Sequence, residues 1–178
     1  NLGGATMLFV VLGMTVYLAL LLQTTRGLTP LETGVALLPL GAAVALLASV
    51  SGRLSARVAP RVQIVGGMLC SCAGAALLSR LHDGAVWPTL VVIGIGVGIA
   101  LPAMTFTAVS AAPAHRTGMA SAIHNASRQL GATLGVAVLG TIVLSHATLG
   151  AGLRAAAVVA SAVLLAMAAA TWRLLAVQ

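Results

Sequence analysis

A row of small and polar side chains within one long apolar stretch provides the clearest candidates for chemistry in this sequence. Ser121, Asn125, Arg128, Ala132 and Gly135 recur at intervals of three and four residues, so they share one face of a helix. Such a face points toward other helices or a water-filled cavity, not toward lipid. Its amide and guanidinium groups could bind a small molecule by hydrogen bonding. The candidate substrate contacts in this stretch are Asn125, Arg128 and Gln129.

Arg128 has two possible roles. The stretch from Leu130 to Ser145 spans only about 24 Å as a helix, which is too short to cross a bilayer. The membrane must also contain several residues before Leu130, which places Arg128 roughly one to two turns inside one membrane face. Its side chain could extend back to the lipid headgroups, or it could face a cavity and contact a substrate or a carboxylate. His124, one turn earlier, could titrate near neutral pH, although a histidine at an interface is more often inert.

Further candidates lie in other apolar stretches. Tyr17, Gln23, Met104 and Thr105 could contact a small molecule in a cavity, and each could equally serve only the structure. A second group could act in helix packing or bending: Gly94, Gly96, Gly98, Pro102, Gly131, Gly135 and Gly140. Glycines followed by a proline make a membrane helix bendable, and the spacing of Gly131 and Gly135 allows another backbone to approach closely. Packing alone explains the glycines equally well.

Several other kinds of chemistry are excluded. The sequence has no nucleophile paired with a base, no cluster of metal ligands and no phosphate-binding loop, so we expect neither an enzyme nor a metal site. Cys70 and Cys72 do not face each other on a helix and are expected to be inert. The formal net charge is +7, but the 9 basic residues are scattered and only 3% of residues are aromatic, which argues against a nucleic-acid partner.

The elements that position these residues are six apolar stretches. Hydrophobic residues occupy 60% of the 178 positions and charged residues only 6%, which is more apolar surface than a soluble domain of this length could bury. A helix of about 20 residues spans a bilayer, and its backbone is satisfied without water. We predict an all-α, polytopic membrane protein, a six-transmembrane-helix bundle within the lipid bilayer. The approximate spans are residues 3–22, 31–50, 62–79, 87–109, 118–145 and 153–177, with Gly150 and Gly152 marking the last loop.

The charges between the stretches predict the orientation. One side carries Arg53, Arg57, Arg61, Arg116 and Arg173, and the other carries Arg26, Arg80 and Arg154 with both acids, Glu32 and Asp83. By the positive-inside rule the first side is cytoplasmic, so both ends of the sequence are expected in the cytoplasm. The sequence begins without Met, and its first stretch lacks a basic lead-in. We therefore expect an upstream part to be missing.

The loop after the second stretch contains a recognisable pattern: Gly52, Arg53 and Leu54, then Ala56 and Arg57, and finally Ala59, Pro60 and Arg61. It resembles the loop signature of the major facilitator superfamily, a Gly, three residues, Asp-Arg, and then Gly and paired basic residues. Ala56 replaces the Asp, and Ala59 and Pro60 replace the later Gly and a basic residue. In that family the loop helps to hold two halves of the protein together. We therefore expect a weaker contact here; a generic cytoplasmic anchor is the alternative.

Two more stretches are similar to the fourteen-helix drug:proton antiporter branch of that family. Residues 27–39 resemble the entry to the second helix of its C-terminal half, and residues 118–140 resemble its penultimate helix. The resemblance covers the whole sequence. It implies the C-terminal half of a major facilitator fold, with the N-terminal six-helix half missing. It also implies that the first, second, fourth and fifth spans line a cavity and that the third and sixth support them.

The resemblance implies a function as well. The expected activity is proton-coupled efflux of amphipathic or cationic drugs and antibiotics, by alternating access, in the inner (plasma) membrane of a bacterium. No cofactor is expected. Because no acid lies within a span, the proton-coupling acid is expected in the missing half. The alternatives are a permease of another branch that moves a metabolite, and a membrane scaffold or sensor subunit that transports nothing.

Overall fold

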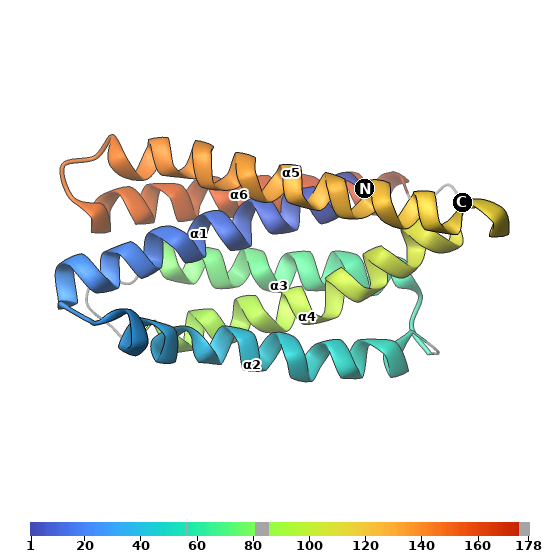
Figure 1. The fold of residues 1–178 in the computed structure, drawn as a ribbon, viewed down its shortest axis with the longest axis horizontal. Helices are drawn as coiled ribbons and strands as arrows, with labels where there is room; N and C mark the ends of the chain where they lie inside the picture. Colours follow the sequence, from blue (N-terminus) through green and yellow to red (C-terminus); the bar gives the residue numbers. More distant parts are fainter. Residues whose placement is uncertain (56, 81–85, 175–178) are drawn as a thin grey trace.

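The structure, a computed structural model, describes residues 1–55, 57–80 and 86–174. Over these ranges the chain forms six long α-helices: α1 Leu2–Arg26, α2 Pro30–Leu54, α3 Pro60–Arg80, α4 Trp87–Ser110, α5 Thr117–Leu144 and α6 Leu149–Leu174 (Figure 1). A short 3₁₀ helix, η1 (Ala114–Arg116), precedes α5. Each α-helix is long and apolar enough to cross a membrane. The predicted fold class, an all-α bundle of six apolar helices, is confirmed.

Successive helices run in opposite directions along the bundle (Figure 1). The loop between α2 and α3, the loop between α4 and α5 and the end of α6 therefore lie together at one end, close to the N-terminus. The turns between α1 and α2 and between α5 and α6 lie at the other end. This arrangement gathers the five arginines that we assigned to the cytoplasm at a single end of the molecule.

The sequence explains the tight turn between α1 and α2. Gly27 ends α1 with φ 65°, in the left-handed region that glycine adopts without strain. α2 then begins with a reciprocal cap, because the hydroxyl of Thr29 accepts the backbone N–H of Glu32 (3.3 Å) and the Glu32 carboxylate accepts the backbone N–H of Thr29 (2.8 Å). Pro30 occupies the first helical position, where no N–H is needed. Glu32 is thus a structural cap at this end of the bundle.

The start of α6 differs from the prediction. We expected Gly150 and Gly152 in a loop and the helix from residue 153, whereas α6 begins at Leu149 and contains both glycines. A Cβ on Gly152 would overlap the backbone carbonyl of Val143 in α5. Gly152 therefore allows two helix ends to pack closely, and residues 145–148 make the turn. Of the predicted features, residues 175–177 of the sixth span, Ala56 and Asp83 lie outside the described residues.

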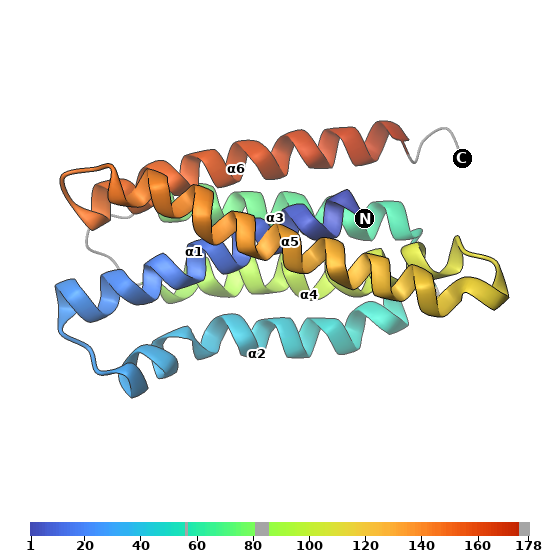
Figure 2. The ribbon, with the colours of Figure 1, turned by 45° about the horizontal axis from the view of Figure 1, so that its top comes forward.

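The packing buries α4, α3 and α1 more deeply than the other helices. α1 packs along α5, α4 packs against both α2 and α3, and α3 also packs against α6 (Figure 2). Among the described residues, only three in α2 are buried: Thr33, Ala43 and Ser51. The largest fully buried apolar side chains are Met7, Val10, Leu18, Leu22, Met68, Leu139, Val143 and Leu164. They come mainly from α1, α3, α5 and α6, so α2 forms an outer edge of the bundle.

Glycines bring α1 and α5 into backbone contact. A Cβ on Gly131 would overlap the backbone of Ala5, and a Cβ on Gly135 would overlap the backbone of Phe9. From the α1 side, a Cβ on Gly13 would lie 2.7 Å from the carbonyl oxygen of Gly135. Such close approach is how helices associate in a membrane, where lipid provides no hydrophobic driving force between them. The spacing of Gly131 and Gly135 thus serves this packing.

The glycines of α4 allow it to pack closely against α2 and α3. A Cβ on Gly94 would lie 2.6 Å from the carbonyl oxygen of Leu40 in α2, and a Cβ on Gly98 would lie 2.8 Å from that of Val44. Gly96 faces α3, where a Cβ would overlap the carbonyl of Gly67. α4 continues as a helix through Pro102 to Ser110. Close packing therefore explains these three glycines, and helix bending at Pro102 stays a prediction.

We predict that Gly135→Ala destabilises the protein by about 1–3 kcal/mol, because the added methyl group meets α1 backbone that has no room to move. The matched control is Gly66→Ala in α3, where the Cβ would meet no atom within 4 Å. Alanine favours a helix over glycine by about 0.5–1 kcal/mol, so the control should melt at the same temperature or slightly higher. Thermal melting of the purified protein in detergent measures both, and an equal effect of the two changes would contradict the packing argument.

Candidate functional site

Helix α5 has three different faces. One is buried against neighbouring helices and contains His124, Gly131, Ala132, Gly135, Leu139, Gly140 and Val143. A second is exposed and apolar, with Met119, Ile123, Leu130 and Leu134. The third is exposed and polar, and its residues Ser121, Asn125, Gln129 and Thr133 follow one another at intervals of four. We call these four residues the polar ridge of α5. A helix of this kind can pack on protein, contact lipid and border a polar space at the same time.

The polar ridge reaches the depth of the lipid chains. α5 ends at Leu144, and counting about 20 residues back from there reaches Asn125. Gln129 and Thr133 therefore lie within the hydrocarbon region. Polar side chains at that depth are unfavourable against lipid, and in membrane proteins they face other helices or a water-filled cavity. The polar ridge is thus suited to border a cavity or a polar partner.

The structure divides the face that we predicted on this helix. Gly135 is buried against α1 and Ala132 is also buried, whereas Arg128 is half-buried and Ser121 and Asn125 are exposed. The division arises because α1 begins opposite residues 124–128, so the first turns of α5 extend past it. Sequence analysis did not single out Thr133. The signal that could have identified it was the regular spacing of four that continues from Ser121 through Gln129.

His124 and Arg128 lie together where α1, α4 and α5 meet. His124 is buried, with its Nε2 3.3 Å from the Thr105 hydroxyl in α4 and its Nδ1 3.1 Å from the Asn1 side-chain oxygen. Gly4 makes room for both side chains, since a Cβ there would lie 2.9 Å from His124 Cε1 and 3.1 Å from Arg128 Cγ. The Arg128 Nε is buried and has no hydrogen-bond partner within the described part of the chain. His124 is therefore packed between helices.

A cavity of about 590 Å³ lies beside His124, between α1, α3, α4, α5 and α6. Its lining is mainly apolar and includes Met104, Ile123 and Met167, with Thr107 and Thr171 as further polar groups. Met104 is itself buried, at 6% exposure. The cavity lies at the end of the bundle that contains the N-terminus, and it places Met104 next to His124 and Thr105.

The candidates in α1 are placed differently. The Tyr17 hydroxyl donates to the backbone carbonyl of Val136 in α5 at 3.0 Å, and its ring lies against Gly140. This hydrogen bond links α1 to α5. Gln23 is exposed near the outer end of α1. Of the residues predicted for a cavity, the structure thus groups Met104 with Thr105 and Asn125 with Gln129, and it places Tyr17 and Gln23 apart from both pairs.

A buried polar network holds the loop between α2 and α3. The Ser51 hydroxyl donates to the backbone carbonyl of Ile99 in α4 at 3.0 Å and lies 3.2 Å from the Gln63 side-chain oxygen. The Gln63 amide donates to the carbonyl of Val58 in the loop at 2.9 Å. Ser51 and Gln63 are 0% and 2% exposed. Sequence analysis missed both residues, because a single Ser or Gln in a helix has no distinctive spacing.

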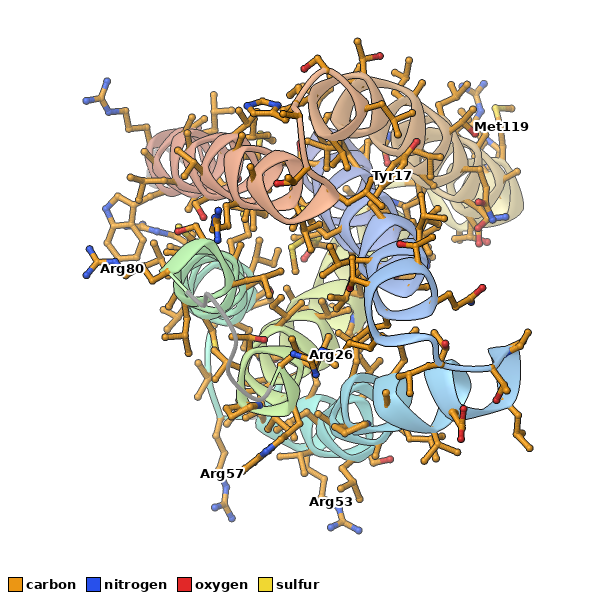
Figure 3. All side chains as sticks on the ribbon, turned by 90° about the vertical axis from the view of Figure 1, so that its left-hand side faces the viewer. Tyr17, Arg26, Arg53, Arg57, Arg80 and Met119 are labelled. Carbon is orange, nitrogen blue, oxygen red and sulfur yellow. The ribbon has the colours of Figure 1, made fainter. Side chains whose placement is uncertain are left out.

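The arginines of this loop lie in two different settings. Arg53 and Arg57 are exposed and project away from the bundle (Figure 3), and Gly52 is also exposed. Arg61 instead lies over Trp172 of α6, with its guanidinium carbon 3.6 Å from the centroid of the ring. The buried Ser51–Gln63 network therefore connects α2 to α3 and α4. Arg61 connects α3 to α6.

These features define a polytopic membrane protein whose glycine-packed helices present a polar surface suited to border a polar space at membrane depth. The sequence model of the Major Facilitator Superfamily matches residues 2–136. The chain belongs to this family, whose members are transporters and not enzymes.

Its relatives include several bacterial drug-resistance proteins. The chain is 39% identical to the multidrug resistance protein Stp of Mycobacterium tuberculosis over 140 residues, which are 77% of this chain and 26% of that protein. It is 39% identical to the puromycin resistance protein pur8 of Streptomyces alboniger over 139 residues, 73% of this chain and 27% of that protein. It is 32% identical to the multidrug efflux pump LfrA of Mycolicibacterium smegmatis over 136 residues, 74% of this chain and 27% of that protein. The matched region thus spans about a quarter of each relative.

We predict that the polar ridge contacts water and that the adjacent apolar face does not. Thr133 and Leu134 lie at the same depth on different faces of α5, so each can be replaced by cysteine after Cys70→Ala and Cys72→Ala changes. Thr133→Cys should react with a hydrophilic maleimide in membranes at least about tenfold faster than Leu134→Cys, because alkylation requires a hydrated thiolate. Mass spectrometry of the labelled protein gives both rates. Similar rates, or faster labelling at position 134, would show that the polar ridge is not next to water.

Proposed function

We propose that the chain forms the C-terminal six-helix half of a drug:proton antiporter of the fourteen-helix branch. In this proposal it works with an N-terminal helical half that this sequence does not contain. The observation that carries the proposal is the exposed polar ridge of α5 at membrane depth. The names of the relatives support it, since they include a multidrug resistance protein, a multidrug efflux pump and a methyl viologen resistance protein.

Substrate binding is assigned to the surface that α1, α2, α4 and α5 present to the other half. Asn125 and Gln129 offer both hydrogen-bond donors and acceptors, and the exposed apolar residues of the other helices offer contact area. A few polar groups on a largely apolar wall suit amphipathic molecules of varied shape. Arg128 lies at the base of this surface with its stem against Gly4. Its guanidinium could bind an anionic group of the substrate or a carboxylate of the other half.

Transport is proposed to follow alternating access, in which one bundle rocks against the other about a central site. The glycine contacts between α1 and α5 would keep this helix pair together as the bundle moves. α3 and α6 would support the cavity-lining helices from outside. These roles agree with the packing, in which α3 joins α4 to α6.

Proton coupling is assigned to the missing half. Coupling needs a group that gains and loses a proton inside the membrane. Among the described residues the only acid is Glu32. Its carboxylate accepts the Thr29 N–H at the start of α2. We further place the protein in the inner membrane of a bacterium, with both ends of this chain in the cytoplasm, because the arginine-rich end should face inward.

Dye efflux tests the proposed function. Cells that produce the full-length protein should expel a fluorescent lipophilic cation, and a protonophore should abolish the efflux because the proton gradient drives it. Cells with an empty vector provide the baseline. Proton-driven uptake of a metabolite without dye efflux would identify an importer of another branch. No transport at all by the correctly inserted protein would favour a scaffold or sensor.

A set of alanine variants tests the polar ridge directly. We expect Asn125→Ala and Gln129→Ala to change the relative resistance to different drugs by roughly fivefold or more, since each removes a hydrogen bond that only some substrates can make. Leu130→Ala, on the apolar face beside Gln129, should leave the profile unchanged. Resistance to a panel of drugs, normalised to the amount of protein in the membrane, gives the result. An equal loss for every drug in all three variants would mean that these residues act only in packing.

A further inference from the structure

The end of α6 carries an aromatic and basic cluster against the start of α3. Arg61 stacks on Trp172 with 3.6 Å between its guanidinium carbon and the ring centroid. Trp172 is 48% exposed, so one part of its ring contacts Arg61 and the rest is open to the surroundings. Arg173 follows directly and is exposed. We call Arg61, Trp172 and Arg173 the α3–α6 cluster.

Within the part of the chain that the structure describes, no acid lies near this cluster. The sequence has only two acids. Glu32 caps α2 at the opposite end of the bundle, and Asp83 lies outside the described residues. Within the described residues the Arg61 Nε is buried and has no hydrogen-bond partner. A guanidinium that is held in place by stacking, with no carboxylate nearby among the described residues, can bind an anionic group.

The surface beneath the cluster is apolar on both helices. Val62, Leu69 and Leu77 are exposed on one stripe of α3. Val158 and Leu165 are exposed on α6, and they lie at intervals of seven residues from Trp172. Tryptophan is enriched where the lipid headgroups meet the hydrocarbon chains, so Trp172 marks that level of the bilayer. Below it, the exposed stripes provide a surface along which acyl chains can lie.

We propose that the α3–α6 cluster binds the phosphate of an anionic phospholipid in the cytoplasmic leaflet. The guanidinium groups of Arg61 and Arg173 hydrogen-bond the phosphate oxygens, Trp172 holds Arg61 in place, and the acyl chains lie along the apolar stripes. The assignment to the cytoplasmic leaflet rests on the orientation given under the proposed function. Anionic lipids of that leaflet attract basic residues near the membrane surface. The bound lipid also supplies a countercharge that the described residues at this end of the bundle do not provide.

Native mass spectrometry of the full-length protein in detergent tests this site. The probes are phosphatidylglycerol, phosphatidylcholine and inorganic phosphate. Arg61→Gln and Arg173→Gln should each weaken phosphatidylglycerol binding about fivefold, because each removes one basic residue from the headgroup. Arg61→Lys should lose part of the binding, since it keeps the charge but not the planar stacking group. The matched control is Arg116→Gln, which removes the same charge from the same end of the bundle in the α4–α5 connection.

Three results would overturn the proposal. One is an equal loss of phosphatidylglycerol in Arg116→Gln, which would indicate attraction by net charge alone. Another is equal binding of phosphatidylcholine, and the third is full displacement of lipid by inorganic phosphate, which would indicate a site for the free anion. Arg173 is exposed, so its variant decides the outcome if Arg61→Gln fails to fold. Dye efflux is measured separately, so the loss of lipid binding and the absence of transport are distinguishable results.

Discussion

Backbone-to-backbone contact at glycines is the interaction on which this bundle depends. In lipid, an apolar side chain gains little by leaving the surroundings of one helix for the surface of another, so association requires close packing. Gly131 and Gly135 bring α5 onto α1, Gly94 and Gly98 bring α4 onto α2, and Gly96 brings α4 onto α3. Each contact involves a rigid backbone, so side-chain movement cannot relieve an added methyl group. The same requirement explains why Gly152 lies in α6, against the end of α5, and not in the loop before it.

This packing also determines which groups of α5 are available for function. The glycine face is used against α1, and the apolar face can contact lipid. The polar ridge then remains exposed, with Gln129 and Thr133 at membrane depth. A surface of that kind is unfavourable in a bundle that stands alone in lipid. It becomes favourable beside a water-filled cavity or a second bundle, which connects the physical chemistry of one helix to membership of a transporter family.

The arginine-rich end of the molecule shows two ways of placing charge near a membrane. Arg53 and Arg57 project away from the bundle, whereas Arg61 is held over Trp172 (Figure 3). The loop that carries these residues is held from below by Ser51 and Gln63, both buried and hydrogen-bonded. Position 56, where the family signature has an acid, is Ala, and the described part of the loop is held by neutral hydrogen bonds. Neutral groups are cheaper to bury than a carboxylate, which suits a loop at the edge of the hydrocarbon region.

The sequence by itself determined the six long apolar helices, their all-α character and the gathering of the arginines at one end of the bundle. These follow from hydropathy, helix rise and the need to satisfy the backbone without water, all of which are local properties. Only the tertiary structure decided that the predicted face of α5 splits at Arg128, that Tyr17 donates to Val136, and that His124 is buried between helices. Each depends on where another helix begins and how closely it crosses, and residue spacing within one helix contains no information about its neighbour.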